Sequence, residues 1–200
     1  MKHKSGFSLV ELLIAIAIMS VLLSLGIPAF NTYINNAKLR ASAQSLLSGI
    51  QMARSEAVRR NINVDFLLTN DDVSAAGFAT AVPNAAGKNW LIRTTDLSAY
   101  VEGKSGAEGS SRSTAAESPI AINDSNDDGV ADAGAISTIT FTSLGATSLA
   151  AAATFSVRNP SAGACAPAGL MRCLNIVVSI GGQARICDPA ATTAGDTRAC

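Results

Sequence analysis

The chain has 200 residues, 15 basic and 15 acidic side chains, and a single histidine, His3. Balanced charge argues against a strongly basic nucleic-acid coat and against a highly charged disordered chain. With one histidine, catalysis or zinc binding based on that residue has almost nothing to use. The length corresponds to one domain, or to one domain with an appendage.

The amino terminus predicts a membrane-spanning helix. From Leu12 to Phe30 the only polar side chains are Ser20 and Ser24. A helix needs roughly 20 such residues to cross a bilayer. The two lysines near the start are expected to keep the leading segment in the cytoplasm. A secretory signal peptide, removed after a small residue in the region 26–29, is the alternative.

Positions 6–13 read GFSLVELL and place a carboxylate, Glu11, near the start of that helix. A carboxylate in a membrane segment costs energy and usually has a partner. A cut between Gly6 and Phe7 would create an amino group nearby. The segment resembles the processing site of type IV prepilins and type II secretion pseudopilins. The resemblance implies cleavage after Gly6 and N-methylation of Phe7 by a prepilin peptidase/N-methyltransferase. It also implies that Glu11 pairs with the amino terminus of a neighbouring subunit during assembly.

A helical stripe continues beyond the apolar run. Its apolar residues recur at steps of four and three, which places them on one helix face. They are Leu39, Ala43, Leu46, Ile50, Ala53 and Ala57. Basic residues such as Arg54 are expected on the rest of the helix surface. Arg59 and Arg60 suit the negative end of a helix dipole and Asn61 suits a stop. The predicted helix therefore runs from Phe7 to about Arg60.

Seven short segments are rich in β-branched residues and bounded by Gly, Asn, Asp or Pro, which predicts strands. They are Ile62–Leu68, Asn89–Arg93, Pro119–Ile122, Ile136–Phe141, Thr154–Arg158, Leu174–Ile180 and Ala184–Cys187. The stretches 103–118 and 144–153 are rich in Ser, Ala and Gly and predict loops. An antiparallel sheet packed on the helical stripe would bury both, so the expected fold class is α+β.

Further segments are similar to the GspH/FimT branch of pilin-like proteins. They are 48–60 (SGIQMARSEAVRR), 89–92 (NWLI), 138–145 (TITFTSLG) and 176–187 (IVVSIGGQARIC). The resemblance implies a pilin-like fold, a long N-terminal helix packed on a small antiparallel β-sheet head. Its parts would be a leader peptide (1–6), a transmembrane and filament-core helix (7–30), the amphipathic half of that helix (31–60) and a β-rich head (61–200). The branch usually has an arginine directly after the glycine at Gly182, where this chain has Gln183.

All four cysteines lie in the last quarter of the chain, at Cys165, Cys173, Cys187 and Cys200. An even number in an exported domain indicates disulfides, and four cysteines allow three connectivities. We favour Cys165 with Cys173, across a Pro/Gly loop, and Cys187 with Cys200, which would tie down the tail. A bond from Cys165 to Cys187 or to Cys200 is the alternative. Because no pair has Cys-x-x-Cys spacing, metal or redox use is not expected.

An acidic segment resembles a calcium loop, because oxygen-bearing side chains recur at alternate positions and Gly129 permits a sharp turn. The candidate ligands are Asp124, Asn126, Asp128 and Asp132. Ala135 stands where a bidentate glutamate would close an EF-hand site. The segment therefore predicts either an Asx-rich turn without metal or a weak calcium site. No other cofactor is expected.

The leading functional hypothesis is structural, a minor pilin of the type IV pilus. Such a protein would span the inner membrane once, hold its head in the periplasm and assemble with the major pilin and other minor pilins. A type II secretion pseudopilin is the alternative, and the cysteine-rich tail together with the segment 182–187 favours the pilus. An enzyme is not expected, because the chain without its leader has no histidine and no recognised nucleophile motif.

DNA binding is a further alternative, because some members of this branch take up DNA and their carboxy-terminal arginines are implicated. Arg172, Arg185 and Arg198 could contact phosphates here. Against this, residues 61–200 carry more acidic than basic side chains, and Gln183 replaces one arginine of the pattern.

Overall fold

The computed structural model describes residues 8–106, 120–124, 130–193 and 195–200. One helix is followed by strands in the order α1 (Leu9–Arg60), β1 (Val64–Thr69), β2 (Asn89–Thr94), β3 (Tyr100–Lys104), β4 (Ala121–Ile122), β5 (Thr138–Phe141), β6 (Ala153–Arg158), the short 3-10 helix η1 (Pro160–Ala162), β7 (Leu174–Val178) and β8 (Ala184–Cys187). The chain divides into two compact units, Met1–Ile34 and Asn35–Cys200. The amphipathic half of α1 thus belongs to the same unit as the strands.

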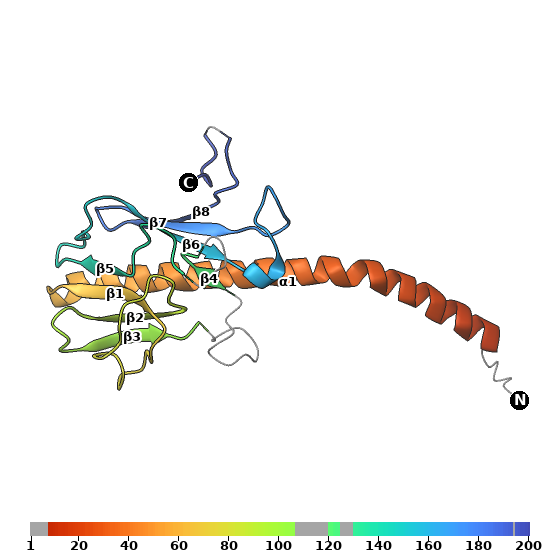
Figure 1. Cartoon of the computed structure of the whole chain (residues 1–200), viewed down its shortest axis with the longest axis horizontal. Coiled ribbons are helices and arrows are strands. Elements are labelled where there is room, and N and C mark those ends of the chain that lie inside the picture. Colours follow the sequence, from red (N-terminus) through yellow and green to blue (C-terminus); the bar gives the residue numbers. More distant parts are fainter. Residues whose placement is uncertain (1–7, 107–119, 125–129, 194) are drawn as a thin grey trace, which may run out of the picture. The chain divides into compact units, whose positions relative to one another are not determined.

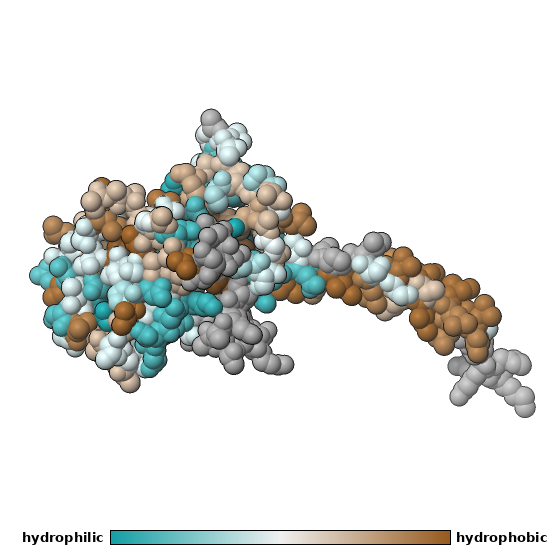
Figure 2. Space-filling view, viewed as in Figure 1, coloured by the Kyte–Doolittle hydropathy of each residue, from teal (hydrophilic) through white to brown (hydrophobic). Residues whose placement is uncertain are grey.

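The first unit presents apolar side chains outward. The large apolar residues from Leu9 to Phe30 whose side chains the structure describes are 51% to 75% exposed, and Figure 2 shows them as a brown surface. The Ser20 hydroxyl donates to the carbonyl of Ile16 at 2.8 Å, and the Ser24 hydroxyl donates to a carbonyl one turn back at 2.8 Å. Within the part of the chain that the structure describes, no helix combines the length and hydropathy that crossing a membrane requires.

In the second unit, the predicted helical stripe forms the centre of the core. Each of its residues is at most 1% exposed, namely Leu39, Ala43, Leu46, Ile50, Ala53 and Ala57. The stripe prediction is therefore confirmed. Gly49 lies on the same side, where an added Cβ would be 3.0 Å from the Phe66 ring and 3.2 Å from the Trp90 ring. The absence of a side chain at Gly49 lets the helix approach the sheet closely.

The end of α1 follows from its last residues. Asn61 has a φ of 55°, and two backbone bonds, from Asn61 N–H to the Val58 carbonyl and from Ile62 N–H to the Ala57 carbonyl, close the terminus. This is the Schellman arrangement, in which asparagine can replace glycine. Hydrogen bonding to Arg59 lowers the pKa of Glu56 to about 2, so this carboxylate stays ionised beside the helix end.

The strands form two antiparallel four-stranded sheets, in the orders β3-β2-β1-β5 and β4-β6-β7-β8. In Figure 1, β1, β2 and β3 lie below the second half of α1, and β6, β7 and β8 lie above it. In the first sheet Phe66 is opposite Ile92 on one side and Ile139 on the other. In the second, Phe155 is opposite Ile176. The expectation of one sheet is thus extended to two, which pack on a shared helix.

The strand predictions hold in position but differ at their ends. Ile62 and Asn63 precede β1 because the helix cap uses Ile62. The strand β7 ends at Val178 because a turn from Ser179 to Gly182 follows, with Gly182 at a φ of 77°. The strand β3 was not predicted and overlaps the start of the expected loop 103–118. Its sequence YVEGK is a weak strand former, and its pairing with the edge of β2 supplies the order.

One large core joins the helix to both sheets. The rings of Phe66 in the first sheet and Phe155 in the second meet edge to face, with centroids 6.2 Å apart. Both rings are fully buried. A second, smaller cluster of Leu67 and Leu91 with residues of the 70–88 loop lies apart from it. The Arg93 guanidinium holds that loop by donating to the Phe78 carbonyl at 2.6 Å.

Candidate functional site

The amino-terminal segment is described only from Ser8 onward, so Gly6 and Phe7 lie outside the described residues and the predicted cleavage stays a prediction. Ser8 caps α1, because the Glu11 N–H donates to the Ser8 hydroxyl at 3.2 Å. The helix accordingly begins at Leu9, two residues after the predicted start. The spacing Ser8-x-x-Glu11 is that of a capping box, which is a sequence signal for a helix start at this position.

Glu11 lies in the first turn of α1, where a negative charge is favourable beside the free N–H groups of the helix. Its side chain is exposed. A partner supplied by another subunit would therefore find this carboxylate accessible. The pairing with a neighbouring amino terminus stays a prediction.

The two predicted disulfides are confirmed. Cys165 is bonded to Cys173 with Cα atoms 5.5 Å apart, and Cys187 is bonded to Cys200 with Cα atoms 5.1 Å apart. The first closes the loop before β7, and the second ties the carboxy-terminal tail to the end of β8. Each closes a short loop and should stabilise the fold by about 2–3 kcal/mol.

Two of the three candidate DNA-binding arginines come together between the disulfide-closed loops. Arg172 and Arg198 line a hollow of about 450 Å³. The Arg198 guanidinium pairs with Asp196 at 2.8 Å and lowers the pKa of that carboxyl to about 2. The Arg172 guanidinium lies 3.7 Å from Asp188. Each arginine in the hollow therefore already faces a carboxylate.

Arg185 occupies a different place. Its guanidinium donates to the Ala199 carbonyl at 3.0 Å and to the Cys200 carbonyl at 3.3 Å. It therefore holds the end of the tail against β8. All three arginines have protein partners that a phosphate would have to replace, and DNA binding stays a prediction.

The acidic loop is described only at its ends. Asn126 and Asp128 lie outside the described residues, so the calcium site stays a prediction. Asp132 donates its N–H to the Asn123 carbonyl at 2.6 Å, which brings the two ends of the loop together. Among the described residues, no three His, Cys, Asp or Glu side chains are grouped as metal ligands.

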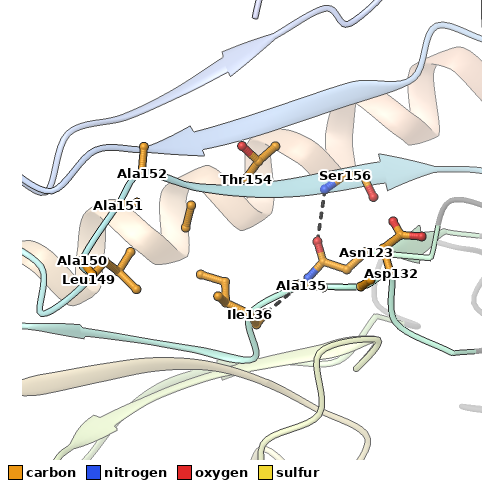
Figure 3. Close-up of a pocket in the computed structure, with 13 residues that line it drawn as sticks. Asn123, Asp132, Ala135, Ile136, Leu149, Ala150, Ala151, Ala152, Thr154 and Ser156 are labelled. Atoms are coloured by element: carbon orange, nitrogen blue, oxygen red, sulfur yellow. Dashed lines mark hydrogen bonds between the residues drawn. The ribbon is translucent and has the colours of Figure 1, made fainter.

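Asn123 organises the base of this loop. It is 2% exposed and has a φ of 57°. Its amide donates to the Ala85 and Ile136 carbonyls at 3.0 and 3.3 Å and accepts from the Ser156 N–H at 3.2 Å. Figure 3 shows this side chain beside a hollow of about 570 Å³ that an alanine-rich segment, 150–153, also lines. Asparagine is common at positive φ, and apart from this preference the sequence carries no signal for the role of Asn123.

Arg54 was expected on the helix surface, but it is half-buried and links the two sheets. Its Nε donates to the Gly145 carbonyl at 2.9 Å and its Nη2 to the Gly181 carbonyl at 3.4 Å. Gly145 follows β5 and Gly181 precedes β8, so one side chain joins a turn from each sheet.

Asn36 makes a similar contact at the other end of the helical stripe. Its amide nitrogen donates to the Leu170 carbonyl at 3.3 Å, and its amide oxygen accepts from the Arg172 N–H at 2.7 Å. The disulfide-closed loop is thereby fastened to the first turn of α1 in the second unit. No periodicity or motif identified Asn36 for this role.

Comparison with known proteins agrees with this architecture. The family model "Type II transport protein GspH" matches residues 42–182, and the model "Prokaryotic N-terminal methylation motif" matches residues 1–27. No curated protein matched the chain.

Two crystal structures of the type IV minor pilin FimU from Pseudomonas aeruginosa strain PAO1 are similar. One has a TM-score of 0.51 at 16% identity, covering 77% of this chain and 91% of that chain. The other has a TM-score of 0.48 at 16% identity, covering 74% and 90%. At this identity the likeness concerns the fold. Because the GspH model covers residues 42–182, which is most of the chain and includes the helical stripe from Ala43 onward and strands β1 to β7, this protein belongs to the GspH family of pilin-like proteins.

Proposed function

We propose that this protein is a minor pilin of the type IV pilus and takes part in starting or assembling the filament. The observation that carries the proposal is the methylation motif over residues 1–27, which includes the beginning of α1, the apolar helix that the β-rich head follows along the chain. This arrangement needs no catalysis by the chain itself. Its function is to insert, to be processed and to join other subunits.

The mechanism follows from where the apolar surface lies. A prepilin peptidase/N-methyltransferase cuts after Gly6 and methylates Phe7, and the segment 7–30 rests in the inner membrane until assembly. Both serine hydroxyls in the apolar run bond to carbonyls of their own helix, which removes a cost of contact with lipid or with other apolar helices. The same surface can therefore pass from the bilayer into a filament core.

Glu11 sets the register of assembly in this proposal. The exposed carboxylate pairs with the Phe7 amino group of a neighbouring subunit, because an ion pair is stronger in apolar surroundings than in water. The head remains in the periplasm, where its two disulfides can form. The other minor pilins and the major pilin are the expected neighbours.

The pseudopilin of a type II secretion system is the alternative within the same family, whose name refers to that pathway. The disulfide-bonded tail and the FimU-like fold support the pilus. Affinity purification of the full chain from its own cells separates the two. Pilus subunits in the eluate support the proposal, and secretion-system subunits alone contradict it.

We predict a mature chain that begins at N-methylated Phe7, which intact-mass and peptide mass spectrometry would measure.

We further predict that Glu11→Ala is processed and membrane-bound but poorly incorporated into filaments, because the partner of the neighbouring amino group is gone. Glu102→Ala, which removes an exposed carboxylate on β3, is the matched control and should be incorporated normally. Equal incorporation of both variants would contradict the role of Glu11.

A further inference from the structure

The loop between Cys165 and Cys173, called here the disulfide loop, is held in one conformation. The disulfide closes the loop covalently, and two backbone hydrogen bonds also close it. The Ala166 N–H donates to the Met171 carbonyl at 2.8 Å, and the Met171 N–H donates to the Ala164 carbonyl at 3.2 Å. A loop with both covalent and hydrogen-bonded closure loses little further conformational entropy when it binds a partner.

The end of the disulfide loop alternates between core and solvent. Met171 and Cys173 are 1% and 6% exposed, whereas Leu170 is 78% exposed and the Arg172 side chain is 64% exposed. In extended chain, side chains two positions apart point to the same side. Leu170 and Arg172 therefore form an outward pair, one apolar and one cationic, on a base buried in the core.

Asn36 determines where this pair lies in the second unit. Its bonds to Leu170 and Arg172 fasten the tip of the loop beside the helix turn with which the unit begins. Arg40 follows Asn36 by four residues, so it lies on the same helix face one turn further, and it is exposed. The tip therefore presents Leu170 and Arg172, and α1 carries a second exposed arginine, Arg40, one turn after the residue that fastens the tip.

Resting on the proposed function, we propose that this tip contacts the anionic headgroups of the membrane from which α1 emerges. Asn36 comes six residues after Phe30, the end of the apolar run, so the length of chain between them limits how far the tip can lie from the end of that run. Leu170 would enter the interfacial region, and Arg172 and Arg40 would reach lipid phosphates. A lipid phosphate would have to replace Asp188, which lies 3.7 Å from Arg172, whereas the second carboxylate of the hollow, Asp196, is paired with Arg198 and does not compete for Arg172.

Such contact would restrict the movement of the head at the membrane surface before assembly. A head fixed at the membrane surface presents the same face to every arriving subunit, which reduces the orientational cost of association. The disulfide loop then acts as a membrane-facing foot of the head. When the helix leaves the membrane and enters a filament, the disulfide loop would lose its contact with the lipid headgroups.

The test uses tryptophan reporters in the full chain, reconstituted in vesicles of phosphatidylethanolamine and phosphatidylglycerol with brominated acyl chains that quench tryptophan on contact. Trp90, the single native tryptophan, is 9% exposed and supplies a constant background. The variants are Leu170→Trp for the tip, Ile18→Trp for the apolar helix and Leu144→Trp as the control. Leu144 is 89% exposed, in the turn beside Gly145.

We expect strong quenching of Ile18→Trp, several-fold greater quenching of Leu170→Trp than of Leu144→Trp, and a blue-shifted emission at position 170. Replacing phosphatidylglycerol by phosphatidylcholine, or adding Arg40→Gln and Arg172→Gln, should reduce the quenching at position 170 several-fold without changing that at position 18.

The remaining outcomes separate the two proposals. Quenching at position 18 with none at position 170 contradicts the membrane contact of the disulfide loop but remains consistent with insertion of the apolar helix. No quenching at position 18 overturns the membrane helix itself. Equal quenching at positions 144 and 170 overturns the foot, because the head would then lie on lipid without preference. A blue shift at position 170 that vanishes on dilution of protein in lipid also overturns it, because the partner would then be another protein chain.

Discussion

Arg54 shows how much a single polar side chain can decide in this head. The turns at Gly145 and Gly182 both have positive φ, of 78° and 77°, and a Cβ at Gly182 would clash with the Gly145 carbonyl. The two turns are thus in direct contact, and Arg54 donates to both. Thr147 adds a bond from its N–H to the Ile180 carbonyl at 2.8 Å.

At this scale we predict that Arg54→Met lowers the free energy of unfolding by about 1–3 kcal/mol, because the part-buried hydrogen bond to the Gly145 carbonyl loses its charged donor. Methionine keeps most of the apolar stem, so the loss reports on the hydrogen bonds. Urea unfolding of the full chain in detergent would measure it. Arg59→Met is the control, since Arg59 is 64% exposed and pairs only with Glu56, and a loss under about 1 kcal/mol is expected there. A similar loss in both variants would contradict the role of Arg54.

At the scale of elements, the stripe of α1 holds the two sheets together. It is made largely of small and medium side chains, with Ala43, Ala53 and Ala57 all fully buried. Small residues let the helix lie close to both sheets, and the larger ones fill the space between them. The rings of Phe66 and Phe155 complete the same core from opposite sheets.

We therefore predict that Ile50→Ala lowers the free energy of unfolding by about 2–5 kcal/mol, because the cavity would border packed side chains that cannot collapse into it. Met52→Ala, two residues away at a position that is 38% exposed, is the control and should change stability by about 0.5 kcal/mol. Thermal unfolding followed by circular dichroism would compare the two. If Met52→Ala were the more damaging, the assignment of the buried face would be wrong.

At the scale of the whole molecule, the described core begins at Leu39, after the boundary between the two units at residues 34 and 35. Among the described residues, none that forms this core belongs to the first unit. The chain therefore combines a helical segment with exposed apolar side chains and a head that has its own core.

We predict that a chain of residues 35–200 folds cooperatively, with a melting temperature close to that of the full chain, because all core residues are retained. Circular dichroism during heating would measure it under oxidising conditions. A chain of residues 51–200 is the control: it lacks Leu39, Ala43, Leu46 and Ile50 and should show no cooperative transition. Failure of the longer chain to fold would show that the first unit contributes to the head.

Local patterns in the sequence accounted for the helix stripe, its end near Arg60, seven strand positions and both disulfides. These features depend on spacing between neighbours, such as the steps of four and three from Leu39 to Ala57 or the short separation of Cys165 and Cys173. The alternation of apolar and polar positions, the capping residues and the loop lengths are properties of one segment at a time. A sequence displays them directly.

The contacts between segments were decided only by the tertiary structure. It divided the strands between two sheets and paired β3 with the edge of β2. It also carried Arg54 to two distant turns and joined Asn36 to a loop 134 residues away. The residues on either side of Arg54 and Asn36 in the sequence do not form a motif that predicts these contacts. The role of each side chain depends on which carbonyl the folded chain brings within hydrogen-bonding distance. Hydrogen bonds between distant segments depend on the packing of the whole core, which no local spacing encodes.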